Sequence, residues 1–124
     1  MNLEIRYLML PVRDREASVQ FFTTILGFEQ VSHVTVRDRD CSALRVSAGG
    51  PLLVLEETGP EAAGPVSRVV LNTDDCLRDY LRLKSLGVEF LSQPEYLSVG
   101  LTVQFTDPSG NVFALFEQRD YQSN

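Results

Sequence analysis

Few residues in this chain could transfer protons or ligate a metal ion. His33 is the only histidine, and the two cysteines, Cys41 and Cys76, form no Cys-x-x-Cys spacing. His33 could act as a general base, but a single histidine on an expected strand more often packs against neighbours or lies partly exposed. The sequence shows no nucleophile with a base and an orienting group, so it indicates no catalytic set.

Arg68 is the most unusual charged residue, because it stands within the apolar segment 66–73. An arginine in such a segment must pair with an acid or meet an anion. Glu56, in another apolar segment, is a candidate partner. If the two pair, Arg68 is structural; if they do not, it could hold a carboxylate or phosphate of a ligand, and both possibilities stay open.

The elements that would position these residues follow from the apolar periodicity and the turn residues. The first half predicts a strand at 5–12, a helix capped by Asp14 and ended by Gly27, and strands at 28–35, 42–46 and 52–56. A turn-rich connector at 58–65 follows. The second half predicts a strand at 66–73, a helix capped by Asp74 or Asp75 and ended by Gly87, and strands at 88–91, 101–106 and 112–117.

The repeated order predicts two copies of one βαβββ unit. Residues 3–57 and 66–118 form the two copies within a single domain of 124 residues. The glycine-ended helices recur about 60 positions apart, which favours an internal duplication. The helix residues Phe21, Phe22, Tyr80 and Leu83 stand at helical spacing, so we expect them to pack against the sheets rather than stack on a ligand.

The charge and the composition exclude several classes of partner. The net charge is −6, and 11 basic residues are interleaved with 17 acids, which disfavours nucleic acid and favours a cationic or neutral ligand. No apolar run is long enough to span a membrane, and the N-terminus has no basic or hydrophobic leader. Cysteines without a pattern are typical of reduced thiols, so we expect a cytoplasmic location.

Three motifs carry a resemblance to a known family. They are Leu-Pro-Val-Arg-Asp at 10–14, the Phe21-Phe22 pair ahead of Ile-Leu-Gly-Phe at 25–28, and Phe-Thr-Asp-Pro-Ser-Gly-Asn at 105–111. With them, residues 5–117 resemble the vicinal oxygen chelate superfamily, which includes glyoxalases, extradiol dioxygenases, and fosfomycin and bleomycin resistance proteins. The resemblance implies an α+β fold in which two βαβββ modules form a curved mixed sheet around a cleft, commonly in a homodimer.

The same resemblance implies where a metal ion would be held. Enzymes of the superfamily usually ligate one divalent metal with a side chain from the first and the last strand of each module. Those positions correspond here to Tyr7, Val54, Arg68 and Ala114. Alanine and valine donate no lone pair, arginine is a cation, and a neutral tyrosine is a poor ligand. We therefore expect no metal and no other cofactor.

Residues two apart on a strand share a face, which extends the predicted lining of the cleft. Tyr96 lies in a stretch flanked by proline and glycine that could form a loop over the cleft mouth. The predicted ligand-binding residues are Tyr7, Met9, Val54, Glu56, Arg68, Val70, Tyr96, Ala114 and Phe116. This mixture of apolar surface and a few polar groups suits a small organic ligand. The alternative is that these are ordinary core residues of a filled half-barrel.

The first functional interpretation is a metal-free protein, similar to bleomycin resistance proteins, that sequesters or carries a small organic compound and could serve in antibiotic resistance. Two alternatives stay open. One is a metal-dependent lyase, isomerase or dioxygenase of the superfamily, in which a one-residue slip would bring Glu57 or Glu117 into the cleft. The other is a structural dimerisation domain with an empty cleft.

Overall fold

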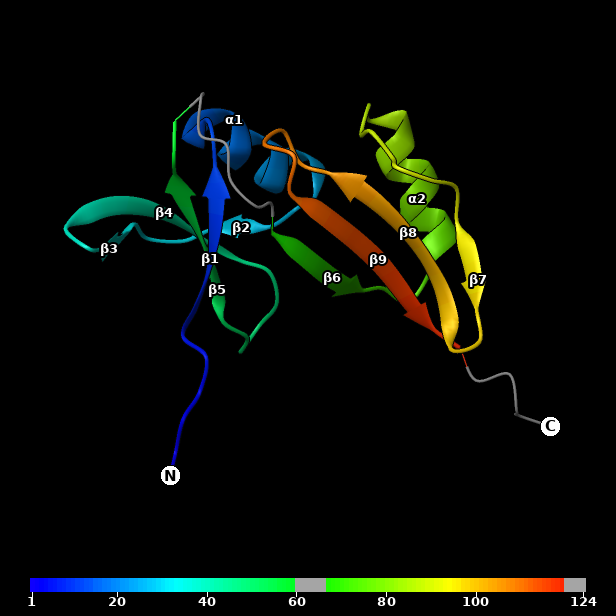
Figure 1. Ribbon diagram of the computed structural model, residues 1–124, viewed down its shortest axis with the longest axis horizontal. Coiled ribbons are helices and arrows are strands. Elements are labelled where there is room, and N and C mark those ends of the chain that lie inside the picture. The colour runs from blue at the N-terminus through cyan, green and yellow to red at the C-terminus, as the bar shows by residue number, and fades with distance from the viewer. Residues whose placement is uncertain (60–66, 120–124) are drawn as a thin grey trace. The chain divides into compact units, whose positions relative to one another are not determined.

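A computed structural model describes residues 1–59 and 67–119 of the chain. It divides into two units, Met1–Pro65 and Val66–Asn124, each with its own sheet and helix (Figure 1). The predicted α+β fold with two βαβββ modules is confirmed, with one mixed sheet in each unit. Most of the predicted connector 58–65 lies outside the described residues.

The first unit is a five-stranded mixed sheet with one helical segment. Its elements are β1 (Tyr7–Val12), α1 (Arg15–Gln20), the π-helix η1 (Phe21–Ile25), β2 (Glu29–Gln30), β3 (Val34–Val36), β4 (Arg39–Arg45) and β5 (Leu52–Glu57). The strand order is β1-β5-β4-β2, and β3 also pairs with β4. β1 runs parallel to β5, while the other pairs are antiparallel. A parallel pair needs a long crossover, which here contains α1 and η1.

The core of the first unit lies between the helical segment and one face of the sheet. The Asp14 carboxylate caps α1 by accepting a hydrogen bond from the Ala17 amide at 3.1 Å, as the sequence predicts. Gly27 ends the segment with a φ of 76°, a conformation that glycine adopts without strain. The most buried core side chains are Leu10, Val12, Phe22, Leu44 and Leu55.

The second unit is a four-stranded sheet packed on one helix. Its elements are β6 (Arg68–Asn72), α2 (Cys76–Ser85), β7 (Glu95–Leu97), β8 (Gly100–Thr106) and β9 (Val112–Gln118), and the strand order is β6-β9-β8-β7. β6 and β9 are parallel, as β1 and β5 are in the first unit. Asp75, rather than Asp74, caps α2. Leu101, Val103, Phe105, Phe113 and Leu115 form the buried face of the sheet.

The turn before β9, at 107–111, is held by a buried hydrogen-bond network. The Asp107 carboxylate accepts hydrogen bonds from the Ser109 and Asn111 amides at 3.0 and 2.7 Å, and from the Asn111 side-chain amide at 2.9 Å. The Asn111 side-chain oxygen accepts from the Ser67 amide at 3.0 Å. Burial raises the pKa of Asp107, and its hydrogen bonds to Asn111 oppose that rise. This motif therefore joins the starts of β9 and β6.

Two predicted strands differ from the structure. The segment 28–35 is not one strand, because three residues, 31–33, lie opposite only two on β4 between the Gln30–Leu44 and Val34–Cys41 pairs. The extra residue makes a β-bulge that separates β2 from β3. The segment 88–91 forms only a single bridge, Phe90 with Phe105, and β7 at 95–97 is the edge strand instead.

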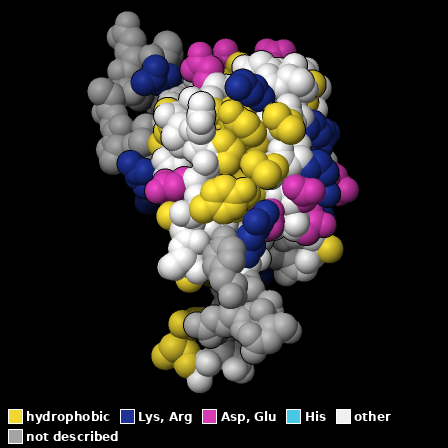
Figure 2. Space-filling view, turned by 90° about the vertical axis from the view of Figure 1, so that its right-hand side faces the viewer, with side chains coloured by type: hydrophobic (Ala, Val, Ile, Leu, Met, Phe, Trp, Pro, Cys, Tyr) yellow, Lys and Arg dark blue, Asp and Glu magenta, His cyan; other side chains and the backbone are white. Residues whose placement is uncertain are grey.

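Figure 2 shows an exposed apolar surface on the side of the second unit that carries α2 and β7. Its exposed apolar residues on and next to these elements are Leu77, Leu81, Leu91, Tyr96, Leu97 and Val99. Charged side chains surround the patch in this view. No helix within the described part of the chain has the length and hydropathy that crossing a bilayer requires.

Ser18 gives a test of the packing of α1. Its hydroxyl is fully buried and has no hydrogen-bond partner within the described residues. Because an unsatisfied buried hydroxyl is costly, we expect Ser18→Ala to raise the free energy of unfolding by about 1 kcal/mol in urea titrations.

Ser42→Ala is the matched control. Ser42 is also buried, but its hydroxyl accepts a hydrogen bond from the Arg15 side chain at 2.8 Å. This second variant should lose stability. A loss of stability in Ser18→Ala comparable to that in Ser42→Ala would show that the Ser18 hydroxyl is satisfied.

Candidate functional site

In the first unit, the predicted ligand-binding residues share the sheet face that points away from α1. The β1–β5 register pairs Tyr7 with Leu52, Met9 with Val54 and Pro11 with Glu56. Val54 is fully buried and clusters with Cys41 and Ala43. Tyr7 packs partly buried against this cluster. Of the four predicted residues, Met9 is the most accessible, at 37% exposed, while Tyr7 and Glu56 are both half-buried.

In the second unit, four predicted residues lie on the sheet face opposite α2. The register pairs Val70 with Ala114, and places Arg68 and Phe116 on the same face. Val70 lies on the edge strand β6 and is 68% exposed. Sequence reasoning missed three β8 residues on this face, Thr102, Gln104 and Thr106, although strict alternation along β8 would have indicated them.

Because the sequence predicts ligand contacts here, we call this surface the ligand face of the second unit. It consists of Arg68, Val70, Asn72, Thr102, Gln104, Thr106, Val112, Ala114 and Phe116. None of these nine side chains is fully buried. The face therefore presents apolar area at its centre, with an arginine at one end and hydroxyl and amide groups along β8.

Tyr96 lies apart from the other predicted residues. It belongs to β7 rather than to a loop, and it pairs with Leu101, which faces α2. Tyr96 is thus on the opposite side of the sheet from Val70, where the Arg119 guanidinium lies 5.6 Å from its ring centre. Arg68 and Glu56 belong to different units, so their pairing stays a prediction.

The four positions at which the family holds its metal do not fit a divalent ion in this chain. Their side chains are phenolic at Tyr7, aliphatic at Val54 and Ala114, and cationic at Arg68. Across residues 1–59 and 67–119, no three His, Cys, Asp or Glu side chains converge in a way that could hold a metal.

Glu57 and Glu117 point to the helix side of their sheets. Glu57 accepts a hydrogen bond from the Arg15 amide at 2.8 Å, and Glu117 accepts one from the Cys76 amide at 2.8 Å. Each acid, at the end of the last strand of its unit, thereby satisfies a free amide at the start of the crossover helix. If a slip of one residue turned Glu57 or Glu117 to the opposite face of its sheet, its hydrogen bond to the helix amide would be lost.

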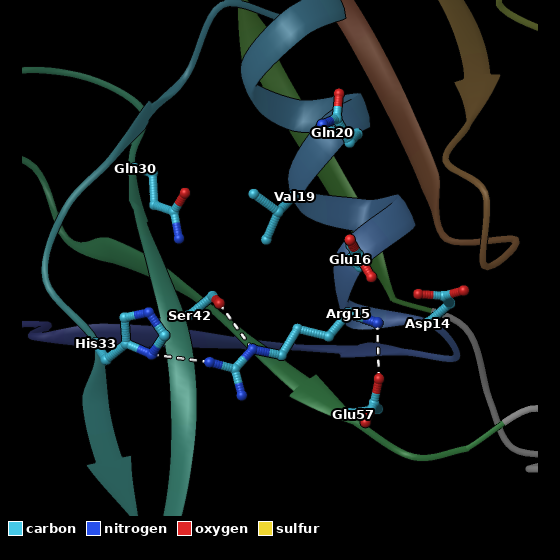
Figure 3. Close-up of a pocket in the computed structure, with 9 residues that line it drawn as sticks. All are labelled: Asp14, Arg15, Glu16, Val19, Gln20, Gln30, His33, Ser42 and Glu57. Carbon is cyan, nitrogen blue, oxygen red and sulfur yellow. Dashed lines mark hydrogen bonds between the residues drawn. The ribbon is translucent and has the colours of Figure 1, made fainter.

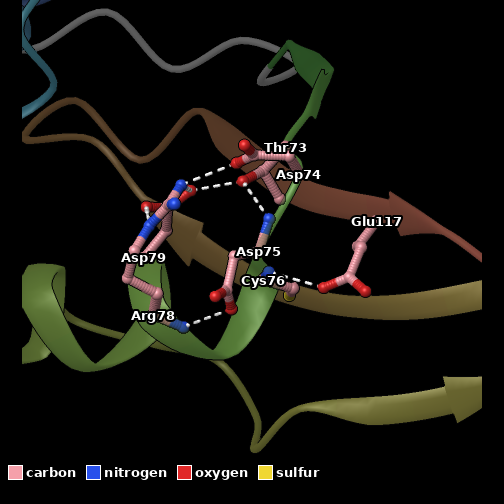
Figure 4. A network of polar contacts seen from close by, with 7 residues as sticks. All are labelled: Thr73, Asp74, Asp75, Cys76, Arg78, Asp79 and Glu117. Atoms are coloured by element: carbon pink, nitrogen blue, oxygen red, sulfur yellow. Dashed lines mark hydrogen bonds and ion pairs between the residues drawn. The ribbon is translucent and has the colours of Figure 1, made fainter.

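The start of α2 carries a network of polar contacts (Figure 4). Arg78 pairs with Asp74 at 2.7 Å and with Asp79 at 3.1 Å, and the Thr73 hydroxyl donates to Asp79. The hydrogen bond from Arg78 holds the pKa of Asp74 below its usual value. Burial raises the pKa of the Cys76 thiol, which makes it a poor nucleophile. This network is therefore structural.

Arg15 makes the corresponding network in the first unit, and sequence reasoning did not single it out. Its guanidinium donates to the Ser42 hydroxyl at 2.8 Å and to the Asp40 carbonyl at 3.0 Å. It also lies 2.8 Å from His33 Nδ1 (Figure 3). The Asp40 carboxylate is 3.3 Å away. The β-bulge at 31–33 carries His33 toward the helix, so Arg15 joins the start of α1 to β4.

The capping role of Glu117 predicts a pH dependence. Hydrogen bonds from Arg119 and from the Cys76 amide hold the pKa of Glu117 below its ordinary 4.5. The unfolded chain therefore takes up this proton at a higher pH than the folded chain. The stabilisation is fully present above the ordinary pKa and is lost as the pH falls through the folded pKa. Glu117→Gln should unfold at lower urea near pH 7 and lose less stability between about pH 5 and about pH 3.

Glu4→Gln makes the same chemical change at an exposed position before β1. This control should keep the wild-type dependence of the urea midpoint on pH. Equal pH dependence in wild type and Glu117→Gln would contradict the capping role.

Comparison with known proteins places the chain in a family. Residues 4–115 match the Glyoxalase/Bleomycin resistance protein/Dioxygenase superfamily model. The uncharacterized protein YetH of Bacillus subtilis is 30% identical, over 86% of this chain and 91% of YetH. Among solved structures, TnmS3, an antibiotic binding protein from Streptomyces sp. CB03234, is 25% identical with a TM-score of 0.82, over 95% of this chain and 98% of TnmS3.

A member of the same superfamily from Sphaerobacter thermophilus has the same fold, with a TM-score of 0.81 and 24% identity over 94% of this chain and 98% of that one. The family model spans most of the chain, and it agrees with the motifs at 10–14 and 105–111 and with the paired βαβββ modules. The chain belongs to the glyoxalase/bleomycin resistance protein/dioxygenase superfamily.

Proposed function

We propose that this protein binds a small organic compound without a metal ion, and sequesters or carries it as bleomycin resistance proteins do. One observation carries the proposal: the positions that would hold the family's metal bear Tyr7, Val54, Arg68 and Ala114, while the sheet surface around the last two is apolar and accessible. Sequestration requires affinity alone, and such a surface supplies it.

The ligand face of the second unit has the chemistry for a planar compound. Val70, Ala114 and Phe116 offer apolar area, each Å² of which contributes about 25 cal/mol when it leaves water. The side chain of Arg68, at one end, makes no ion pair or hydrogen bond with the described residues. Its planar guanidinium can stack on an aromatic ring or donate two hydrogen bonds to a carbonyl or carboxylate. TnmS3 is an antibiotic binding protein, and this likeness supports a small organic ligand.

A homodimer is part of the proposal. A second copy of the chain could cover the exposed apolar surface over α2 and β7, because apolar patches rimmed by charged residues can mark protein interfaces (Figure 2). We also propose a cytoplasmic location, because Cys41 and Cys76 are buried free thiols.

A ligand screen with a matched pair of variants tests the binding function. Planar antibiotics and aromatic metabolites at about 100 times their dissociation constant should add about 2.7 kcal/mol to stability, which thermal-shift measurements detect. Arg68→Met should abolish the ligand-induced shift while the melting temperature of the free protein stays unchanged.

Arg82→Met removes the same charge from the exposed surface of α2, away from the ligand face. This control should keep the full ligand-induced shift. A broad library without a single stabilising compound would contradict the binding function. Equal loss of the ligand shift in both variants would contradict the role of Arg68.

Metal analysis tests the second half of the proposal. Protein purified and dialysed with zinc, nickel or manganese should carry well below one equivalent by elemental analysis, because alanine, valine and arginine supply no lone pair to the ion. One tightly held equivalent per chain would refute a metal-free site.

A further inference from the structure

A hollow lies in the first unit, on the sheet face opposite Tyr7 and Met9. It has a volume of about 440 Å³. We call it the acidic pocket, and it is lined by Asp14, Arg15, Glu16, Val19, Gln20, Gln30, His33, Ser42 and Glu57. Figure 3 shows α1 on one side of it, with β4 and the segment that carries Gln30 and His33 on the other. Ser42 shares the helix-side face of β4 with the buried Leu44.

The positive charge in the acidic pocket is already paired. The Arg15 guanidinium contacts Ser42, His33 and Asp40. Four of its five N–H groups are engaged in these contacts. Asp40 lies 3.3 Å from it and offsets its charge. Arg15 therefore holds the wall of the pocket together and is not free to bind an incoming anion.

The remaining charges of the lining are negative. Asp14 and Glu57 each use an oxygen to accept an amide hydrogen bond at the start of α1. Glu16 is exposed and has no hydrogen bond or ion pair recorded within the described residues. Among these lining residues, three carboxylates outnumber the single guanidinium, which is paired, and this excess of negative charge favours a cation over an anion. Arg39 lies next to the pocket, where it donates to the Glu57 carbonyl at 2.9 Å, and offsets part of this charge.

His33 offers a hydrogen-bonding atom to the same space. Its Nδ1 lies 2.8 Å from an Arg15 nitrogen and 2.9 Å from the Asp40 carboxylate. In a neutral ring, Nδ1 either accepts from Arg15 or donates to Asp40, so Nε2 is a donor in one tautomer and an acceptor in the other. Figure 3 shows this second nitrogen on the side of the ring that faces Gln30. A hydroxyl group suits both tautomers, because it donates and accepts.

We propose that the acidic pocket binds a small organic cation that also carries a hydroxyl group, such as an aminoalcohol or an aminophenol. The ammonium group lies beside Glu16 and Asp14, the hydroxyl group meets His33 Nε2, and the carbon skeleton covers Val19. The volume exceeds what a single ion needs and falls in the range of small-molecule sites. This site is separate from the ligand face and does not depend on it.

Three phenols of one skeleton test the charge of the ligand. Tyramine is a cation, 2-(4-hydroxyphenyl)ethanol is neutral, and 4-hydroxyphenylacetate is an anion. In amide NMR titrations of the full-length protein, tyramine should bind most tightly and shift the amides of residues 14–20 and 30–33. The anion should not bind there. Tighter binding of the neutral or anionic probe, or shifts confined to other residues, would overturn the proposal.

Variants test the two contacts separately. Glu16→Gln should weaken tyramine binding by about twofold to fivefold, as expected for a partly exposed ion pair, while Glu4→Gln at the exposed N-terminus leaves it unchanged.

Phenethylamine lacks the hydroxyl group and should bind wild type about threefold to tenfold more weakly than tyramine. In His33→Ala this difference should vanish. A difference that persists would refute the His33 contact. Arg68→Met should leave tyramine binding intact, so a failure here stays distinct from a failure of the ligand face.

Discussion

In each unit, a glutamate on the last strand accepts a hydrogen bond from an amide at the start of the crossover helix, and this contact ties the helix to the sheet. Glu57 accepts from the Arg15 amide, and Glu117 accepts from the Cys76 amide, both at 2.8 Å. Because side chains alternate along a strand, placing these acids on the helix side sends Glu56 and Phe116 to the other side. This contact and the buried Leu53, Leu55, Phe113 and Leu115 on the same faces together fix which residues of β5 and β9 point away from the helices.

The capping contacts leave different kinds of side chain on the two faces of each sheet. The faces that point away from the helices carry Tyr7, Met9, Val70 and Ala114, which are suited to apolar contact and not to a metal. The acids that could have served as ligands are engaged in capping α1 and α2. A shift of one residue that brought Glu57 and Glu117 to the opposite face would also expose the cores of both sheets.

The polar networks on the helix side differ between the units despite their common plan. In the second unit, Arg78 pairs with Asp74 and Asp79 on its own helix, and Figure 4 shows a closed set of contacts. In the first unit, Arg15 reaches across to Ser42 on β4 and to His33 in the segment between β2 and β3. The β-bulge at 31–33 makes this reach possible and leaves the hollow beside α1.

The sequence by itself predicts the paired βαβββ plan, because the caps, helix ends and turns that define it depend only on residues close together in the chain. Asp14 caps its helix and Gly27 ends it through contacts within a few positions, and the turn motif at 107–111 is satisfied largely by its own side chains. The face shared by Tyr7 and Met9, and by Arg68 and Val70, followed from alternation alone.

Only the tertiary structure decided the features that depend on partners distant in sequence. The bulge arises from pairing with β4, and the position of Tyr96 depends on its register with Leu101. Val54 is buried because side chains of β3 and β4 pack around it. Arg15, His33 and Asp40 are up to 25 positions apart and meet only when the helix docks on the sheet. No local sequence pattern predicts such contacts, because each one depends on where a distant helix or strand packs in the folded chain.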